Sequence, residues 1–175
     1  MINLEKRFEE SILKNYDVKF YSIGASDEDH GPAIPRNFDD FYAKRICVQA
    51  AEKIGADYRG HLPYTSDKVG IIARRWNHSY IDPQDLLDNI INDIDLDNRK
   101  NITLTGREFS NVVIYSGHGG NNFLSDYSKE ISEQIGIPSI YIPPLSGAYI
   151  IHEEFGRITP VHAGDVEHCL TAYFG

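Results

Sequence analysis

The chain has 175 residues, of which 41% are hydrophobic and 25% are charged, as in a typical globular protein with one core. Its formal net charge of −9 argues against nucleic-acid binding, because neutralising many phosphates needs a basic surface. No apolar stretch approaches the roughly 20 residues of a membrane span, and the acidic amino terminus lacks a signal-peptide pattern. We therefore expect a cytoplasmic protein that binds neither nucleic acid nor membrane. Its two cysteines, Cys47 and Cys169, form no zinc-binding spacing, so a metal would be held by histidines and carboxylates.

The amino-terminal half alternates helical and extended patterns. Apolar residues recur at helical spacing over residues 4–13, and an apolar strand is predicted over residues 18–23. Good helix formers over residues 38–54 predict a helix that ends at Gly55, a natural C-cap. A short strand is expected within residues 56–64.

The carboxyl-terminal half continues this alternation. Asp82 and Pro83 form an N-cap and first-turn pair that begins a helix. A buried strand is expected over residues 111–115, a crossover helix over residues 122–135 and a further strand over residues 139–142. The helix after Pro83 carries a buried stripe of Leu86, Leu87, Ile90, Ile91 and Ile94.

The repeated order of strand, loop and helix predicts an α/β fold with a largely parallel sheet flanked by helices. We expect a single domain over residues 1–175, because no repeat or linker divides the chain. Residues 67–79 are basic and aromatic without clear periodicity, and no element is assigned to them.

A glycine-rich loop with a central histidine, Ser116 to Asn122, directly follows the strand over residues 111–115. Loops at the carboxyl ends of parallel strands commonly carry the chemistry of α/β enzymes. The glycines flanking His118 permit a positive φ and a close approach to a ligand, and its imidazole can bind a metal or move a proton. Taken alone, an anion-binding loop or a plain tight turn explains the segment equally well.

Three further groups of acids and histidines lie beside predicted elements. Glu28 and His30 are two residues apart, so in an extended chain they can address one ion, although a solvated acidic turn is an equal alternative. Asp39 lies in the first turn of a predicted helix, where acids are ordinary dipole partners. Near the carboxyl end, the spacing of Glu167 alone is more typical of a surface helix carboxylate than of a ligand, and a structural histidine is the alternative for His162.

In combination, these segments resemble the creatininase (creatinine amidohydrolase) family. That family carries a Glu-x-His-Gly-Pro segment with an aspartate nine residues after its histidine, then an Asn-Gly-His-Gly-Gly-Asn-like loop, and later a His-Ala-Gly-x-x-Glu segment. The chain has Glu28 to Pro32 with Asp39, then Ser116 to Asn121, then His162 to Glu167, in the same order. The resemblance extends from about Ser22 to the end of the chain.

The resemblance implies a three-layer creatininase-like fold and a site for two divalent ions, either zinc, iron(II) or manganese. It implies His162 as the catalytic acid or base and Asp39 as the bridging ligand. The backbone amides of Gly119 and Gly120 would help to fix a substrate carbonyl. The full implied ligand set is Glu28, His30, Asp39, His118 and Glu167.

The match also departs from the family pattern. Creatinine-specific members carry a glutamate where this chain has Gly120, which argues against creatinine as the substrate. The chain stops about eight residues after Glu167, a short carboxyl end for the family. Members assemble as rings, so the resemblance implies a homo-oligomer.

Residues 55–65 together with His78 resemble an archaeal branch that removes the formyl group from a formylaminopyrimidine ribonucleotide in riboflavin and deazaflavin-coenzyme synthesis. Such a small-molecule amide carries a phosphate, which Arg74 and Arg75 are candidates to bind, with His78 lining the pocket; a solvated basic loop is the alternative. His61 receives no predicted role. Two other functions stay open: a peptidase or other amidohydrolase of the same family, and a non-catalytic, metal-binding assembly subunit.

Overall fold

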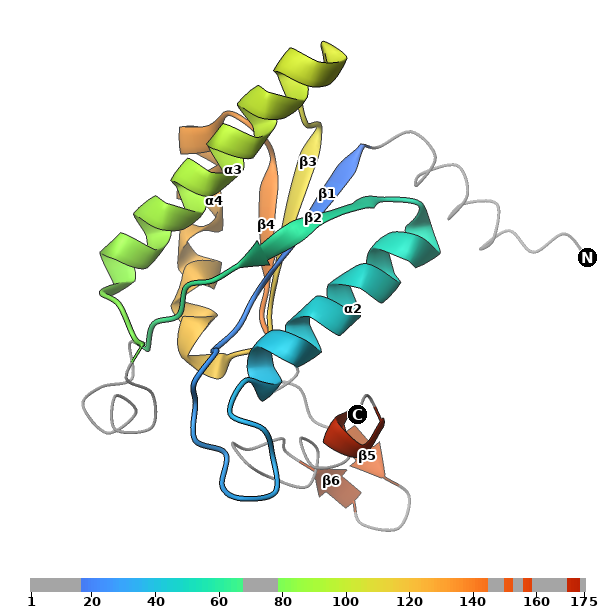
Figure 1. Cartoon of the computed structure of the whole chain (residues 1–175), viewed down its shortest axis with the longest axis vertical. Coiled ribbons are helices and arrows are strands. Elements are labelled where there is room, and N and C mark those ends of the chain that lie inside the picture. Colours follow the sequence, from blue (N-terminus) through green and yellow to red (C-terminus); the bar gives the residue numbers. More distant parts are fainter. Residues whose placement is uncertain (1–16, 68–78, 145–149, 153–155, 159–169, 174–175) are drawn as a thin grey trace, which may run out of the picture.

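The computed structural model describes residues 17–67, 79–144, 150–152, 156–158 and 170–173. A four-stranded parallel sheet in the order β2-β1-β3-β4 forms its centre (Figure 1). A separate pair of strands, β5 and β6, is antiparallel. The strands are β1 (Val18–Ile23), β2 (Asp57–Leu62), β3 (Asn111–Ser116), β4 (Ser139–Ile142), β5 (Ile150–His152) and β6 (Gly156–Ile158).

Helices cover both faces of the parallel sheet. Helix α2 (Phe38–Ile54) packs on one face, against β1, β2 and β3. Helices α3 (Pro83–Thr105) and α4 (Leu124–Ile135) lie together on the other face (Figure 1). A short 3-10 helix, η2 (Gly119–Phe123), leads from β3 into α4. The arrangement is a three-layer α/β sandwich, as the sequence predicted.

Local sequence explains where the helices begin and end. The side chain of Asp82 caps α3 by accepting a hydrogen bond from the backbone N–H of Gln84 at 2.9 Å, and Pro83 follows at the first helical position. Gly55 ends α2 in the left-handed conformation, with a φ of 71° that glycine adopts without steric cost.

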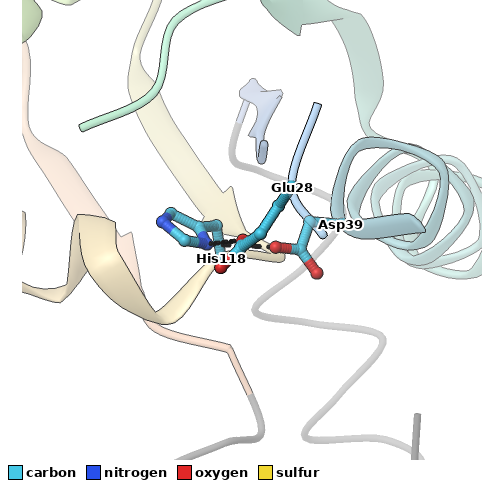
Figure 2. Close-up of side chains that lie close together, drawn as sticks. All are labelled: Glu28, Asp39 and His118. Atoms are coloured by element: carbon cyan, nitrogen blue, oxygen red, sulfur yellow. Dashed lines mark hydrogen bonds and ion pairs between the residues drawn. The ribbon is translucent and has the colours of Figure 1, made fainter. Parts of the chain in front are cut away.

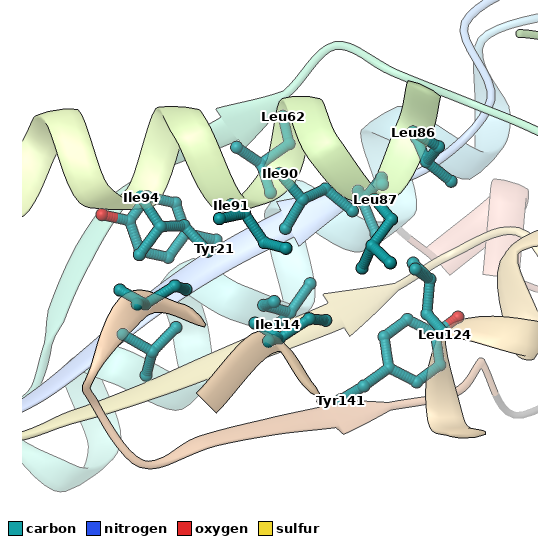
Figure 3. Packing of buried hydrophobic residues seen from close by; sticks show 14 of the residues in the cluster. Tyr21, Leu62, Leu86, Leu87, Ile90, Ile91, Ile94, Ile114, Leu124 and Tyr141 are labelled. Carbon is teal, nitrogen blue, oxygen red and sulfur yellow. The ribbon is translucent and has the colours of Figure 1, made fainter. Parts of the chain in front are cut away.

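The larger of the two apolar cores lies between the sheet and helices α3 and α4 (Figure 3). Ile90 and Ile94 of α3 are fully buried, and they project toward the sheet residues Tyr21 and Ile114. On the opposite face, Phe20 and other apolar residues pack against α2. Because both faces are covered, the central strands are buried on both sides, as is usual for parallel sheets.

The element predictions are confirmed wherever the structure describes the residues. The strands over residues 18–23 and 139–142 and the helix over residues 38–54 have the predicted bounds. The predicted crossover helix over residues 122–135 is divided into η2 and α4, because the glycine-rich turn first winds as a 3-10 helix. The predicted helix over residues 4–13 lies outside the described residues.

Strands β5 and β6 were not predicted, because each has only three residues, too few for a periodic pattern. In the described part of the chain, no helix is both long and apolar enough to cross a membrane.

The buried stripe of α3 gives a first testable prediction. Ile90→Ala removes a side chain with no solvent exposure and leaves a cavity, so we expect it to lower the free energy of unfolding by roughly 2 to 5 kcal/mol. Leu104→Ala on the same helix is the control, because Leu104 is 84% exposed. Urea unfolding followed by circular dichroism measures both, and equal losses would contradict this packing.

Candidate metal centre

The candidate site gathers side chains from three segments at one end of the parallel sheet. Glu28 comes from the loop after β1, Asp39 from the first turn of α2, and His118 from the loop after β3 (Figure 2). All three are buried, with exposed fractions of 3%, 3% and 4%. Parallel strands bring these loops to the same edge, where α/β proteins bind their ligands.

Two carboxylates converge on one nitrogen of His118. Nδ1 of His118 lies 2.7 Å from Oε2 of Glu28 and 3.0 Å from Oδ2 of Asp39 (Figure 2). A single N–H cannot fully compensate two buried carboxylates, and burying unpaired negative charge is costly. Carboxylate oxygens and an imidazole nitrogen that meet in this way match the ligand set of a divalent cation.

The second oxygen of Asp39 faces a different histidine. Oδ1 of Asp39 lies 3.3 Å from Nε2 of His30, so this carboxylate directs one oxygen at each imidazole. Nδ1 of His30 lies 3.1 Å from the carbonyl oxygen of Glu28, which can only accept a hydrogen bond. A neutral His30 that donates from Nδ1 therefore presents the lone pair of Nε2 to Asp39, and only a proton or a cation between them makes that contact favourable.

The pKa values of the two histidines and of Asp39 are shifted because these groups are buried close to one another. Burial alone would lower the pKa of His118, but hydrogen bonds and charge interactions with Asp39 and Glu28 raise it to about 10. For His30, burial is likewise outweighed by Asp39 and Glu28, and the pKa rises to about 9. Burial would raise the pKa of Asp39, yet the two histidines hold it well below its usual value. The site therefore stabilises positive charge at the positions of both imidazoles.

The loop after β1 turns one of its three consecutive acids inward. Asp27 and Asp29 are paired with the exposed Arg36, and the backbone N–H of Glu28 donates to the carbonyl of Arg36 at 3.0 Å. Glu28 alone of the three is buried. The solvated acidic turn considered from sequence thus describes Asp27 and Asp29, but not Glu28.

Two glycines of the His118 loop allow neighbouring groups to approach the backbone closely. None of Gly117, Gly119 and Gly120 has a positive φ, so that expectation was wrong. A Cβ at Gly117 would lie 2.2 Å from the carbonyl oxygen of Asp39, and one at Gly120 would lie 2.3 Å from Nε2 of His118. The loop is shaped by Ser116, whose hydroxyl accepts from the backbone N–H of His118 and donates to its carbonyl. Glycine is required here because backbone and imidazole occupy the space of a side chain.

The other predicted site residues divide into two described glycines and five residues outside the described part of the chain. Gly119 and Gly120 begin η2 directly after His118, with Gly120 buried and Gly119 exposed. Substrate contacts of these glycines remain a prediction. The remaining predicted site residues lie outside the described part of the chain: Arg74, Arg75, His78, His162 and Glu167.

The structure adds site residues that the sequence did not reveal. The hydroxyl of Tyr80 lies 3.3 Å from Nε2 of His118. Burial, and then the charges of Glu28, Asp67 and Asp39, raise the pKa of Tyr80, so its hydroxyl keeps its proton. Tyr80 lies in a short segment without periodicity, and no signal in the sequence marks it.

His61, which received no role, contacts the acid next to Asp39. Its Nε2 lies 3.0 Å from Oδ1 of Asp40, and its Nδ1 lies 2.9 Å from the hydroxyl of Ser22 on β1. This buried polar contact joins β1 and β2 to the first turn of α2, the turn that supplies Asp39. The sequence places His61 within the strand expected over residues 56–64, but nothing in the sequence marks its contact with Asp40.

The donor set fits a divalent metal ion. Within the described residues, ligand atoms of Glu28, Asp39 and His118 lie within 4.8 Å of one another, and His30 borders them through Asp39. Imidazole and carboxylate ligands suit zinc, manganese and iron(II). Such a site can activate water and polarise a carbonyl.

The fold and this site define a creatininase-like α/β domain, and solved structures agree. Creatinine amidohydrolase (creatininase) superposes with a TM-score of 0.54 at 19% sequence identity, over 79% of this chain and 54% of that one. A creatininase mutant of Zn-Zn type gives a TM-score of 0.53 at 19% identity, over 79% and 55% of the two chains. The shared feature is the fold.

Curated relatives carry one name, 2-amino-5-formylamino-6-ribosylaminopyrimidin-4(3H)-one 5'-monophosphate deformylase. The protein from Methanobrevibacter ruminantium is 28% identical over 141 residues, 77% of this chain and 54% of the relative. That from Methanothermobacter thermautotrophicus is 28% identical over 124 residues, 69% and 47% of the two chains. The chain thus spans about half the length of the curated relatives it matches.

No protein-family model matches the chain. The relatives and the fold nevertheless agree with the similarity to creatininases and to their relatives that the sequence segments indicate. The resemblance predicted from the three sequence segments is confirmed.

Gly120 offers a test of the packing around His118. In Gly120→Ala the added methyl group would lie 2.3 Å from Nε2 of His118 and 2.8 Å from the carbonyl oxygen of Ser66, so the imidazole must move. We expect Zn²⁺ affinity to fall by about tenfold or more, as measured by calorimetry. Gly55→Ala, at the other end of α2, strains a positive φ in open space and serves as the control. Unchanged zinc affinity in Gly120→Ala would contradict this geometry.

Proposed function

We propose that the chain is a metal-dependent amidohydrolase that cleaves a non-peptide carbon–nitrogen bond, namely the formamide of a formylaminopyrimidine ribonucleotide. The observation that carries the proposal is the buried convergence of Glu28 and Asp39 on Nδ1 of His118, in a creatininase fold. The names of the curated relatives supply the substrate class.

The proposed ligands divide between two positions. Glu28, Asp39 and His118 would hold one divalent ion, and Asp39 and His30 would contribute to a second, since the two oxygens of Asp39 face different histidines. Glu167 completes the set proposed from the family resemblance. When bound, two such ions supply a nucleophile from water at neutral pH and polarise the carbonyl of the substrate.

The residues of the chain would then strengthen the electrostatic interactions of the site, protonate the leaving group and bind the substrate carbonyl. The carboxylates are buried, and the lower local dielectric strengthens the electrostatic interactions that they make. His162 is proposed to protonate the leaving nitrogen, so that water and a formamide yield an amine and formate. The backbone amides of Gly119 and Gly120, directly beside His118, are proposed to hydrogen-bond the formyl oxygen.

The choice of substrate is proposed to depend on the small size of Gly120 and on arginines that bind the phosphate of the nucleotide. Gly120 leaves no side chain at the position where creatinine-specific family members carry a glutamate. Arg74 and Arg75 are proposed to bind the phosphate of the nucleotide, and His78 to line the base pocket. The proposal includes a cytoplasmic location and a homo-oligomeric assembly, both carried from the sequence.

Formate release tests the proposal. The protein loaded with Zn²⁺, Mn²⁺ or Fe²⁺ is incubated with the formylated aminopyrimidine ribonucleotide, and formate is measured enzymatically. We expect Asp39→Asn to reduce the rate by about a thousandfold or more, because it removes the charge of the carboxylate shared by both positions. Asp85→Asn, an exposed substitution in the first turn of α3, should have no effect.

His162→Ala is the negative control, because it lacks the proposed proton donor and measures the background release of formate. No formate above that background, with each metal, would contradict the deformylase proposal. A metal-loaded protein that also hydrolyses no cyclic amide or peptide would favour the non-catalytic assembly subunit instead.

A further inference from the structure

The imidazole of His118 has a partner on the side away from the carboxylates. Nδ1 faces Glu28 and Asp39, while Nε2 lies 3.3 Å from the hydroxyl oxygen of Tyr80. The two rings are tilted by 40°, with their centroids 5.6 Å apart. The charge of Glu28 also acts on this hydroxyl. Tyr80 therefore contacts His118 of the candidate metal centre directly.

Hydrogen bonds to the loop after β2 hold Tyr80 in this position. The backbone N–H of Ile81 donates to the carbonyl of Thr65 at 3.0 Å, and the hydroxyl of Ser66 donates to the carbonyl of Ile81 at 2.7 Å. The backbone N–H of Ser66 donates in turn to Oδ1 of the fully buried Asn121. Tyr80 is thus attached through its neighbour to the loop that carries His118.

The lack of a side chain at residue 120 leaves room for this contact. A Cβ there would lie 2.3 Å from Nε2 of His118, closer than the hydroxyl of Tyr80. The edge of the imidazole that faces Tyr80 is therefore open to a hydrogen bond only because Gly120 is glycine.

The donor and acceptor roles follow from the two nitrogens of the imidazole. Nδ1 faces Glu28 and Asp39, so to bind a cation there it must offer a lone pair, and the ring proton is then on Nε2. The tyrosine oxygen, 3.3 Å away, can accept a hydrogen bond from that N–H. An imidazole protonated at Nε2 presents the lone pair of Nδ1 toward Glu28 and Asp39, which is the tautomer that binds a metal there.

We propose that Tyr80 is a positioning residue of the metal centre: its hydroxyl accepts a hydrogen bond from Nε2–H of His118, which fixes the tautomer and the rotation of this ligand. This inference rests on the proposed metal site. It extends that proposal to a segment, just before α3, that none of the recognised sequence motifs includes.

The test compares Tyr80→Phe with wild type, using Zn²⁺ alone as the probe of the full chain. Removal of the hydroxyl leaves the ring and its packing, so we expect zinc affinity at pH 7 to fall about 10- to 100-fold in calorimetry. Tyr64→Phe is the matched control, because the hydroxyl of Tyr64 likewise has a polar side-chain partner, the carboxylate of Asp93 on α3 at 2.9 Å. It should bind zinc as wild type does.

A second measurement separates positioning from general stability. Long-range ¹H–¹⁵N spectra of histidine-labelled, zinc-loaded protein should show His118 with its proton on Nε2 in wild type and in Tyr64→Phe. In Tyr80→Phe this proton should exchange rapidly with water. Melting temperatures of the metal-free proteins should fall no further in Tyr80→Phe than in Tyr64→Phe.

The outcomes distinguish the two proposals. If wild type and Tyr80→Phe bind zinc equally well and the His118 signal is unchanged, the proposed role of Tyr80 is wrong. The proposed metal site would still be supported. Wild type that binds no zinc would overturn both. Weaker binding together with a changed His118 signal supports the positioning role.

Discussion

The arrangement depends on one shared carboxylate. Asp39 directs Oδ2 to His118 and Oδ1 to His30, at 3.0 and 3.3 Å, while the carboxylate of Glu28 approaches the same nitrogen of His118. These groups are buried, and two carboxylates there require positive charge between them and the imidazoles. Protons meet this requirement, as the raised pKa values of the histidines show, and divalent cations meet it with stronger, geometrically defined bonds.

The fold brings these groups together because its loops share one edge of a parallel sheet. The helix that supplies Asp39 lies close enough to the loop after β3 that a Cβ at Gly117 would overlap its backbone. Asn121 joins the same loop to its neighbours, accepting from the backbone of Ser66 and donating to the carbonyl of Gly24. Helices pack against both faces of the sheet, and a site carried by such packed elements has better defined distances between its ligands than one carried by free loops.

Much of this was predictable from sequence, for identifiable reasons. Apolar runs and capping residues predicted β1, α2 and β4 with the observed bounds, since those signals are local. The candidate ligands were found through their motifs and order, whereas their spacing alone left surface alternatives open. Tyr80 and His61 were missed because each acquires its role from a tertiary contact with a distant segment. The expected positive φ in the His118 loop was wrong, because close packing rather than a tight turn requires Gly117 and Gly120.

Anomalous X-ray scattering from crystals of the zinc-loaded protein, recorded at the zinc absorption edge, tests the central claim most directly. The shared carboxylate predicts two peaks about 3.5 to 4 Å apart. One should lie between Glu28, Asp39 and His118, and the other between Asp39 and His30. An anomalous map with no peak beside Asp39, at saturating zinc, would contradict the account.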